Sequence, residues 1–220
     1  MESTQRTTID ANSTYKNPLK RIVGHLLFSY DSFLELPNKY LLVNAILIAF
    51  FSSMLVLANI LVLISKFELT GTIGQGWIDF KNNLILSALL TPGSLLLWAL
   101  LMHSMLSFMG GKGKFLRSLA IYCIAQIPVI IGDLILLIVA FTQPTIIADG
   151  SLDPGSFTQL TGQYFHSHSL ASLILTPFTI LYSNLVAGIG MSADHKAPEL
   201  LGWISGGIIA LFSILLRIFV

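Results

Sequence analysis

The chain has 220 residues, of which 54% are hydrophobic and only 10% are charged, and its mean hydropathy is +0.79. A soluble domain usually carries about 25% charged residues, so this chain has too few charges to cover a water-exposed surface. The composition therefore predicts an integral membrane protein. The net charge of +1 gives no reason to expect a nucleic-acid partner, and the single cysteine, Cys123, excludes an intramolecular disulfide.

The N-terminal region divides into two parts. Residues 1–16 are polar, contain no apolar signal-peptide core, and are expected to be flexible. Residues 17–37 predict a cytoplasmic amphipathic helix, because Asn17 can cap it, Pro18 suits its first position, and apolar residues recur at helical spacing. This helix can lie in the lipid headgroup layer or pack on the ends of the membrane spans.

Five later stretches are long and apolar enough to cross a bilayer, which takes about 20 residues. The expected spans are residues 41–65, 84–109, 115–141, 168–191 and 200–220. They should be helices, because backbone groups in lipid must be hydrogen-bonded within the protein. The predicted fold class is all-α: a polytopic membrane domain of five helices over residues 38–220, preceded by the interfacial helix.

The distribution of lysine and arginine predicts the orientation. Nine of these residues lie in or beside the segments on one side of the membrane: Arg6, Lys16, Lys20, Arg21, Lys39, Lys112, Lys114, Arg117 and Lys196. Only Lys66, Lys81 and Arg217 fall on the other side. Because positive residues are retained in the cytoplasm, the N-terminus should be cytoplasmic and the C-terminus outside.

The stretch FMGGKGKF, residues 108–115, combines three glycines with two lysines between two apolar spans. A nucleotide-binding loop would need Ser or Thr after the final Gly-Lys and a preceding strand, and neither is expected here. The alternative is a tight turn in which Gly110 or Gly111 supplies a left-handed cap for the second span. Lys112, Lys114 and Arg117 would then form a basic turn at the anionic cytoplasmic surface.

The intramembrane polar residues of interest are ionisable, namely His103, Asp133 and Arg217. Such residues can mark a proton or solute path, and the similar depth of Asp133 and Arg217 also suggests an ion pair. They can instead support hydrogen bonds between helices, and this interpretation is favoured because the set is small.

Proline and glycine residues in the spans predict bent, closely packed helices. Pro92, Pro128 and Pro177 can each kink a span. Glycines in the fifth span should allow close helix approach; they are Gly202, Gly206 and Gly207.

The outer loop contains His166 and His168, which are weak candidates for zinc or copper ligands, with Asp149 or Asp153 as further donors. Two histidines without a strict motif are more typical of interfacial residues, so no metal and no cofactor is predicted. The chain also lacks the sequence motifs of serine hydrolases and zinc peptidases, and no catalytic residue is assigned.

Several of these features together resemble the Yip domain family, the Ypt/Rab-interacting protein-like integral membrane proteins. The shared features are a cytoplasmic amphipathic segment, His103 in the second span, the turn GGKG followed by Phe115, and Pro128 in the third span. The resemblance covers about residues 18–220 and implies five spans with a cytoplasmic N-terminus. The DLYGP-type signature of eukaryotic members is missing, so the chain resembles an archaeal or bacterial member, and Rab binding is not transferred to it.

Two functions follow as hypotheses. The first is a non-enzymatic scaffold that organises lipid, other membrane proteins or copies of itself through its cytoplasmic face. The second is a small transporter or channel that uses the intramembrane polar residues.

Overall fold

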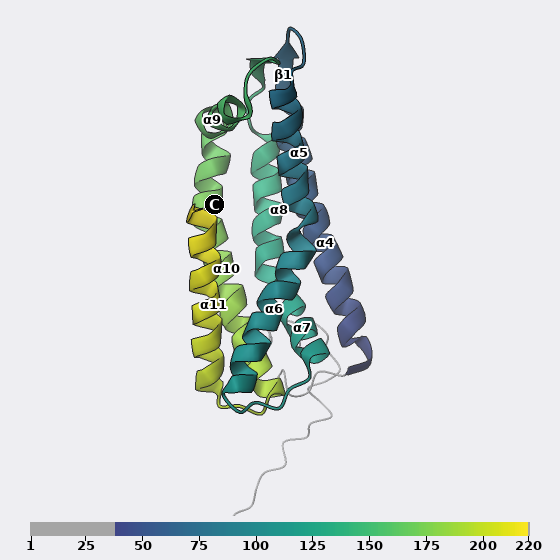
Figure 1. Cartoon of the computed structure of the whole chain (residues 1–220), viewed down its shortest axis with the longest axis vertical. Coiled ribbons are helices and arrows are strands. Elements are labelled where there is room, and N and C mark those ends of the chain that lie inside the picture. Colours follow the sequence, from purple (N-terminus) through teal and green to yellow (C-terminus); the bar gives the residue numbers. More distant parts are fainter. Residues whose placement is uncertain (1–37, 220) are drawn as a thin grey trace, which may run out of the picture.

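The computed structural model describes residues 38–219, and the side chains of residues 42–216. The predicted N-terminal segments, residues 1–16 and 17–37, lie outside this range. The described part is mainly helical and forms an elongated bundle (Figure 1). One end carries two short strands and a short helix, and we call it the strand end. The other carries the glycine turn and the last interhelical connection, and we call it the basic end.

Five stretches of helix in the structure are long and apolar enough to cross a membrane, as the sequence predicted. They are provided by α4 (Asn38–Ser65), α6 (Thr91–Phe108), α7 with α8 (Phe115–Ile124 and Ile127–Phe141), α10 (His166–Asp194) and α11 (Glu199–Phe219). Many of their large apolar side chains are exposed on the outside of the bundle, as expected for surfaces that face lipid. The protein is therefore a multi-pass membrane protein.

The predicted second span, residues 84–109, was wrong at its beginning. Helix α5 (Gln75–Leu89) starts earlier, and the chain bends at Leu90 before α6 continues from Thr91. Pro92 lies in the first turn of α6, where its missing N–H costs nothing in α6 itself. Leu90 is followed by Thr91, Pro92, Gly93 and Ser94, which interrupt the apolar pattern, and the bend lies where the sequence analysis allowed for a kink at Pro92.

The two other span prolines behave differently from each other. Pro128 lies in the first turn of α8, directly after the break at Ala125–Gln126 that separates α7 from α8. Pro177 lies inside α10, which continues as one helix from His166 to Asp194. A proline in a span therefore marks a break at residue 128 but not at residue 177.

The strand end contains structure that the sequence analysis did not predict. Strands β1 (Phe67–Thr70) and β2 (Ile146–Asp149) pair in parallel, and α9 (Pro154–Tyr164) lies across the end of the bundle. Five aromatic side chains form a small core beneath them: Phe67, Trp77, Phe80, Phe157 and Phe165. The sequence did contain a start signal for α9. The side chain of Asp153 accepts a hydrogen bond from the backbone N–H of Ser156 and caps the helix, and Pro154 occupies its first turn.

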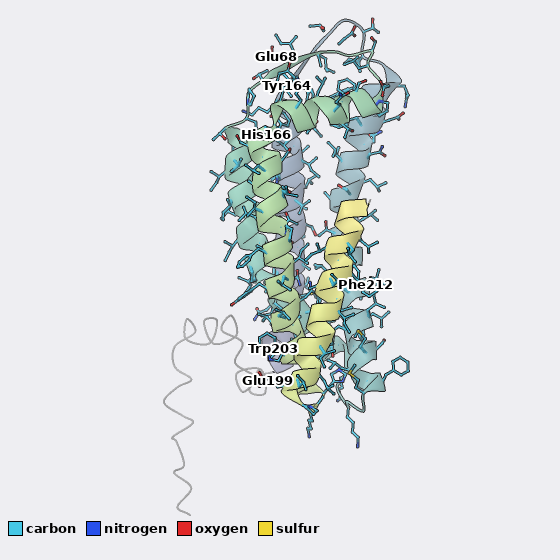
Figure 2. The ribbon with its side chains drawn as sticks, turned by 90° about the vertical axis from the view of Figure 1, so that its left-hand side faces the viewer. Glu68, Tyr164, His166, Glu199, Trp203 and Phe212 are labelled. Atoms are coloured by element: carbon cyan, nitrogen blue, oxygen red, sulfur yellow. The ribbon has the colours of Figure 1, made fainter. Side chains whose placement is uncertain are left out.

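The basic end is held by close contact between α10 and α11. A Cβ atom on Gly202 would lie 2.6 Å from the carbonyl oxygen of Gly188, and one on Gly206 would lie 2.5 Å from that of Asn184. The expected close approach is confirmed for these two residues. It was wrong for Gly207, which faces open space. Figure 2 shows Glu199 and Trp203 near this contact, with His166 and Tyr164 at the opposite end of the molecule.

Candidate functional site

Three polar side chains meet near the basic end, each from a different helix. Nδ1 of His103 on α6 lies 2.9 Å from Oγ of Ser118 on α7. Nε2 of His195, at the end of α10, lies 3.1 Å from the same hydroxyl and 3.0 Å from Nδ1 of His103. Ser118 and His195 are buried, with exposed fractions of 0% and 1%. We call these three residues the polar knot.

The glycine turn closes over this knot. Cβ atoms on Gly111 and Gly113 would lie 2.6 Å from Nδ1 and 2.5 Å from Nε2 of His195, so only glycine admits the imidazole at these positions. The backbone N–H of Lys112 donates to the carbonyl oxygen of His195 at 3.0 Å. The turn is thereby fixed to the end of α10.

Helices α6 and α10 end with the same capping motif. Gly110 has φ +92°, its N–H bonds to Ser107, and the N–H of Gly111 bonds to Leu106. This confirms the predicted left-handed glycine cap and assigns it to Gly110. Lys196 takes the same place after α10, with φ 53° and an N–H bond to Ala193.

The hydrogen bonds of the knot determine its protonation. An imidazole nitrogen carries either a proton or a lone pair, so the three contacts cannot all be full hydrogen bonds. Nδ1 of His195 is buried without a hydrogen-bond partner among the described residues. A proton on Nδ1 would be a buried N–H without an acceptor, whereas a proton on Nε2 can be donated to Ser118, so we assign the proton of His195 to Nε2. His195 then donates to Ser118, and Ser118 donates to His103.

The same burial keeps His195 neutral. Loss of hydration, together with repulsion from His103, lowers the pKa of His195 from 6.5 to about 4. Two imidazolium rings could not share this site, because both N–H groups would point into the same small space. The knot therefore holds three helices together as a neutral network near pH 7.

An ion pair lies beside the knot. Nε of Arg117 on α7 lies 2.6 Å from Oδ1 of Asp194 on α10, and the two side chains are 22% and 8% exposed. Arg117 directly precedes Ser118, and Asp194 directly precedes His195. The ion pair therefore joins α7 to α10 beside the contact between Ser118 and His195. Arg117, which was expected in a basic turn, is thus also a structural residue.

The basic turn lines a surface cleft of about 420 Å³ outside this ion pair, and we call it the basic cleft. Its walls come from α4, α7, the glycine turn and the end of α10. The lining residues are Leu42, Lys112, Gly113, Lys114, Leu116, Arg117, Ala120 and Asp194. The structure therefore brings together all three residues of the predicted basic turn in one concave site.

In the described part of the chain, the weak metal candidates do not gather into one cluster. His166 is exposed, and Nε2 of His168 lies 3.2 Å from Oδ1 of Asn59. Asp149 and Asp153 instead accept hydrogen bonds from Ser151 and Ser156, which lower the pKa of each carboxyl. Within residues 42–216, no three His, Cys, Asp or Glu side chains gather closely enough to bind a metal ion.

The remaining polar residues of the spans contribute mainly contacts between helices. Asn59 of α4 meets His168 of α10, and the hydroxyl of Tyr122 donates to Oδ1 of Asn184 at 3.0 Å. Asp133 lies half-buried on α8, whereas the side chain of Arg217 lies outside the described range. The proposed pair of Asp133 and Arg217 therefore stays a prediction.

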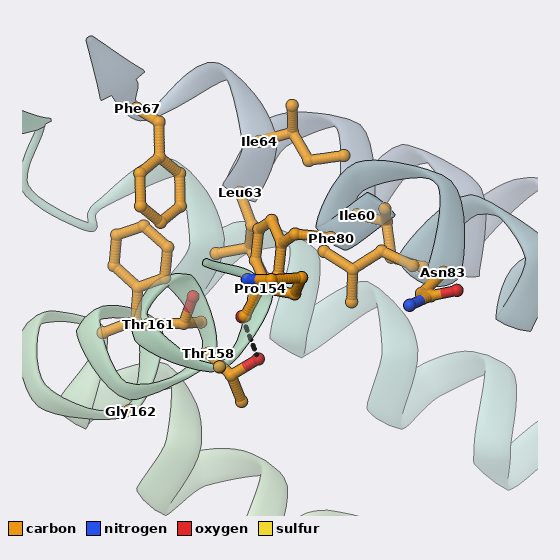
Figure 3. A pocket seen from close by; sticks show the side chains of 13 residues that line it. Ile60, Leu63, Ile64, Phe67, Phe80, Asn83, Pro154, Thr158, Thr161 and Gly162 are labelled. Atoms are coloured by element: carbon orange, nitrogen blue, oxygen red, sulfur yellow. Dashed lines mark hydrogen bonds between the residues drawn. The ribbon is translucent and has the colours of Figure 1, made fainter. Parts of the chain in front are cut away.

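A second cavity, of about 460 Å³, lies at the strand end (Figure 3). Apolar side chains dominate its walls, and none of its lining residues is charged. The hydroxyls of Thr158 and Thr161 already donate to backbone carbonyls of Pro154 and Phe157. It therefore offers little polar recognition, in contrast to the basic cleft.

Comparison with models of protein families shows to which family the chain is related. The model of the Yip1 domain matches residues 27–220, which is most of the sequence. The chain belongs to the Yip1 domain family. Searches of the curated proteins and of the solved structures gave no match. The family that His103, the glycine turn and Pro128 indicated is thereby confirmed.

Sequence reasoning missed three residues of the polar knot and its neighbouring ion pair in this Yip1 domain, namely Ser118, Asp194 and His195. None belongs to a recognised motif, and they are separated from one another or from His103 by as many as 92 positions. A signal did exist, because the predicted topology places the ends of the second and fourth spans and the start of the third on the same side of the membrane. Polar residues at these three ends could have been expected to meet.

Proposed function

We propose that this Yip1 domain is a non-enzymatic membrane scaffold that binds partners at its basic end, with this end facing the cytoplasm. The excess of lysine and arginine in the segments on this side supports the orientation. Lys112, Lys114 and Lys196 are all exposed there. The domain lies in the lipid bilayer. Its proposed partners are other membrane proteins or further copies of the chain.

The observation that carries the proposal is the construction of the polar knot. Hydrogen bonds among His103, Ser118 and His195 join α6, α7 and α10 next to the connections at the basic end. The bond from Lys112 to His195 extends this order to the glycine turn. A surface that is ordered before binding loses less entropy when a partner arrives, so this construction favours a docking platform.

The serine in the knot does not suggest a hydrolase. Ser118 and its neighbouring histidines resemble a nucleophile with its base, but the hydroxyl has no exposed surface. Its hydrogen bonds to both histidines are part of the packing beneath Gly111 and Gly113. A substrate could reach it only after the turn had opened, so the site supports a structural role.

An exposed aromatic residue at the basic end gives a test of partner binding. Phe108 is 91% exposed at the end of α6, directly before the glycine turn. A photo-cross-linking residue at this position, in the full chain and in native membranes, should form discrete protein adducts that mass spectrometry can identify. The same residue at Ile147, 71% exposed at the strand end, is the matched control. Equal protein adducts at both positions, or none at Phe108, would contradict the proposal.

One cavity favours a small transporter as a second candidate function. It has a volume of about 440 Å³ beside α10, and its polar lining consists of His168, Ser169, Ser172 and Thr176. If it belongs to a solute or proton path, wild-type proteoliposomes should show flux that His168→Leu reduces. The absence of flux from the wild-type protein across a panel of solutes would reject this candidate.

A further inference from the structure

The basic cleft combines cationic side chains with an apolar wall. Lys112 and Lys114 are exposed on the turn, and Arg117 lies at the start of α7. Leu42 of α4 and Leu116 of α7 also line it, and they are 44% and 63% exposed. A ligand that fills this volume must therefore present an anionic part and an apolar part.

The charge balance of the cleft favours an anion. Among the described residues, Asp194 is the one acidic residue that lines the cleft, and its Oδ1 already lies 2.6 Å from Nε of Arg117. Asp194 also attracts the ammonium group of Lys114, but this one carboxylate faces three cationic lining residues, so the described part of the cleft carries an excess of positive charge. Phosphate is the group that such a pair of lysines complements, and a membrane surface supplies it in lipid headgroups.

The leucines distinguish a lipid from a free phosphate ion. Inorganic phosphate would leave Leu42 and Leu116 exposed to water, whereas a phospholipid can place an acyl chain against both. These residues belong to helices that enter the bilayer directly from the cleft, at α4 and α7. The apolar wall is thereby continuous with the surfaces that face the lipid tails.

We propose that the basic cleft binds an anionic phospholipid, with the headgroup phosphate between Lys112 and Lys114 and an acyl chain along Leu42 and Leu116. This proposal rests on the proposed function, because it names a ligand for the same basic end. The polar knot serves the site by holding Gly113, and with it both lysines, in place over His195. The occupant is a lipid, not a soluble anion and not an acidic protein.

Titration of the purified full-length protein with defined lipids tests the site, with native mass spectrometry to count bound lipids. Phosphatidylglycerol should bind more tightly than phosphatidylcholine of the same chain length. A lysine near an anionic surface contributes about 1 kcal/mol, so Lys114→Gln should weaken phosphatidylglycerol binding about fivefold. Lys196→Gln is the matched control, because Lys196 is exposed at the same end but does not line the cleft, and it should change binding less than twofold.

The apolar half of the site is tested separately. Leu116→Asn should weaken phosphatidylglycerol binding, while inorganic phosphate at millimolar concentration should compete poorly with the lipid. Equal effects of Lys114→Gln and Lys196→Gln would show that anionic lipid is attracted to the basic end in general and not to the cleft, which would overturn the proposal. Equal binding of phosphatidylcholine, or complete displacement by inorganic phosphate, would overturn it as well.

Failure of this proposal can be distinguished from failure of the scaffold function. If lipid selectivity is absent while Phe108 still yields protein adducts, the scaffold proposal stands and the lipid site does not. If lipid selectivity is present and Phe108 yields no protein adduct, the cleft binds lipid and the scaffold function is rejected.

Discussion

Gly113 lies directly against the imidazole of His195, so closely that a Cβ atom on Gly113 would stand 2.5 Å from Nε2 of the ring. A single methyl group at this position cannot be accommodated unless His195 or the turn moves. Because Nε2 also bonds to Ser118, that movement would break the polar knot. The short connection between α6 and α7 is thereby coupled to the end of α10.

This contact predicts a cost for Gly113→Ala. Overpacking in a closed site typically costs about 1–3 kcal/mol, and the loss of the bond between His195 and Ser118 adds to it. The melting temperature of the purified protein in detergent should therefore fall by several degrees. Gly207→Ala is the control, because a Cβ there meets no atom within 4 Å. A Gly113→Ala protein as stable as the Gly207→Ala protein would contradict the geometry.

A second prediction concerns pH. The pKa of His195 is about 4 in the folded protein and 6.5 ordinarily, so the unfolded chain binds the additional proton first as pH falls. The contribution of His195 to the free energy of unfolding is fully present above pH 6.5. It decreases as the pH falls towards 4 and stays constant below that value. The loss is up to roughly 3 kcal/mol, at about 1.4 kcal/mol for each pKa unit.

Thermal unfolding in detergent between pH 7.5 and 4 measures this loss, and comparison with His195→Asn isolates the histidine. The variant should be less stable than the wild type at pH 7.5, and the difference should narrow as the pH falls. A difference that stays constant over this range would show that His195 does not remain neutral in the folded protein.

The contact between α10 and α11 gives a third prediction. Gly202→Val places side-chain atoms where the carbonyl oxygen of Gly188 now lies, 2.6 Å from the position of the first added carbon. The helices must separate, so we expect a loss of several kcal/mol or a failure to assemble the bundle. Gly207→Val, on the open side of the same helix, should retain a monodisperse elution profile. Similar behaviour of the two variants would show that the helices do not meet through this face.

A fourth prediction tests the ion pair. Asp194→Asn removes the charge that faces Arg117, and breaking a fully buried pair costs about 3–5 kcal/mol. Because Arg117 is 22% exposed, we expect a smaller loss of roughly 1–3 kcal/mol. A double-mutant cycle with Arg117→Gln should give a coupling energy of the same sign. Additive effects of the two substitutions would mean that the pair contributes nothing to stability.

The orientation gives a fifth prediction. With Cys123→Ala as the background, a cysteine is introduced by Lys196→Cys at the basic end or by Ile147→Cys at the strand end. A membrane-impermeant maleimide added to intact cells should label only the Ile147→Cys protein, and lysis should expose the other. Labelling of Lys196→Cys in intact cells would reverse the proposed topology and remove the cytoplasmic scaffold function.

Much of the architecture could be read from composition and local chemistry. The third span was predicted at residues 115–141, and the structure has the same bounds. The cap at Gly110 was also predictable, because a left-handed residue is needed where α6 must end. In contrast, the pairing of β1 with β2 lies within sequences whose local patterns do not demand it.

The rotation of each helix could not be read from its sequence, and this is why the knot was missed. Apolar residues occur on all sides of α4 and α6, since lipid and protein interior are similarly apolar and neither selects a single hydrophobic face. The sequence by itself thus determined that the chain crosses the membrane five times and where its positive charges gather. Only the tertiary structure decided that His103, Ser118 and His195 meet, because their contact depends on how three separate helices turn and pack against one another.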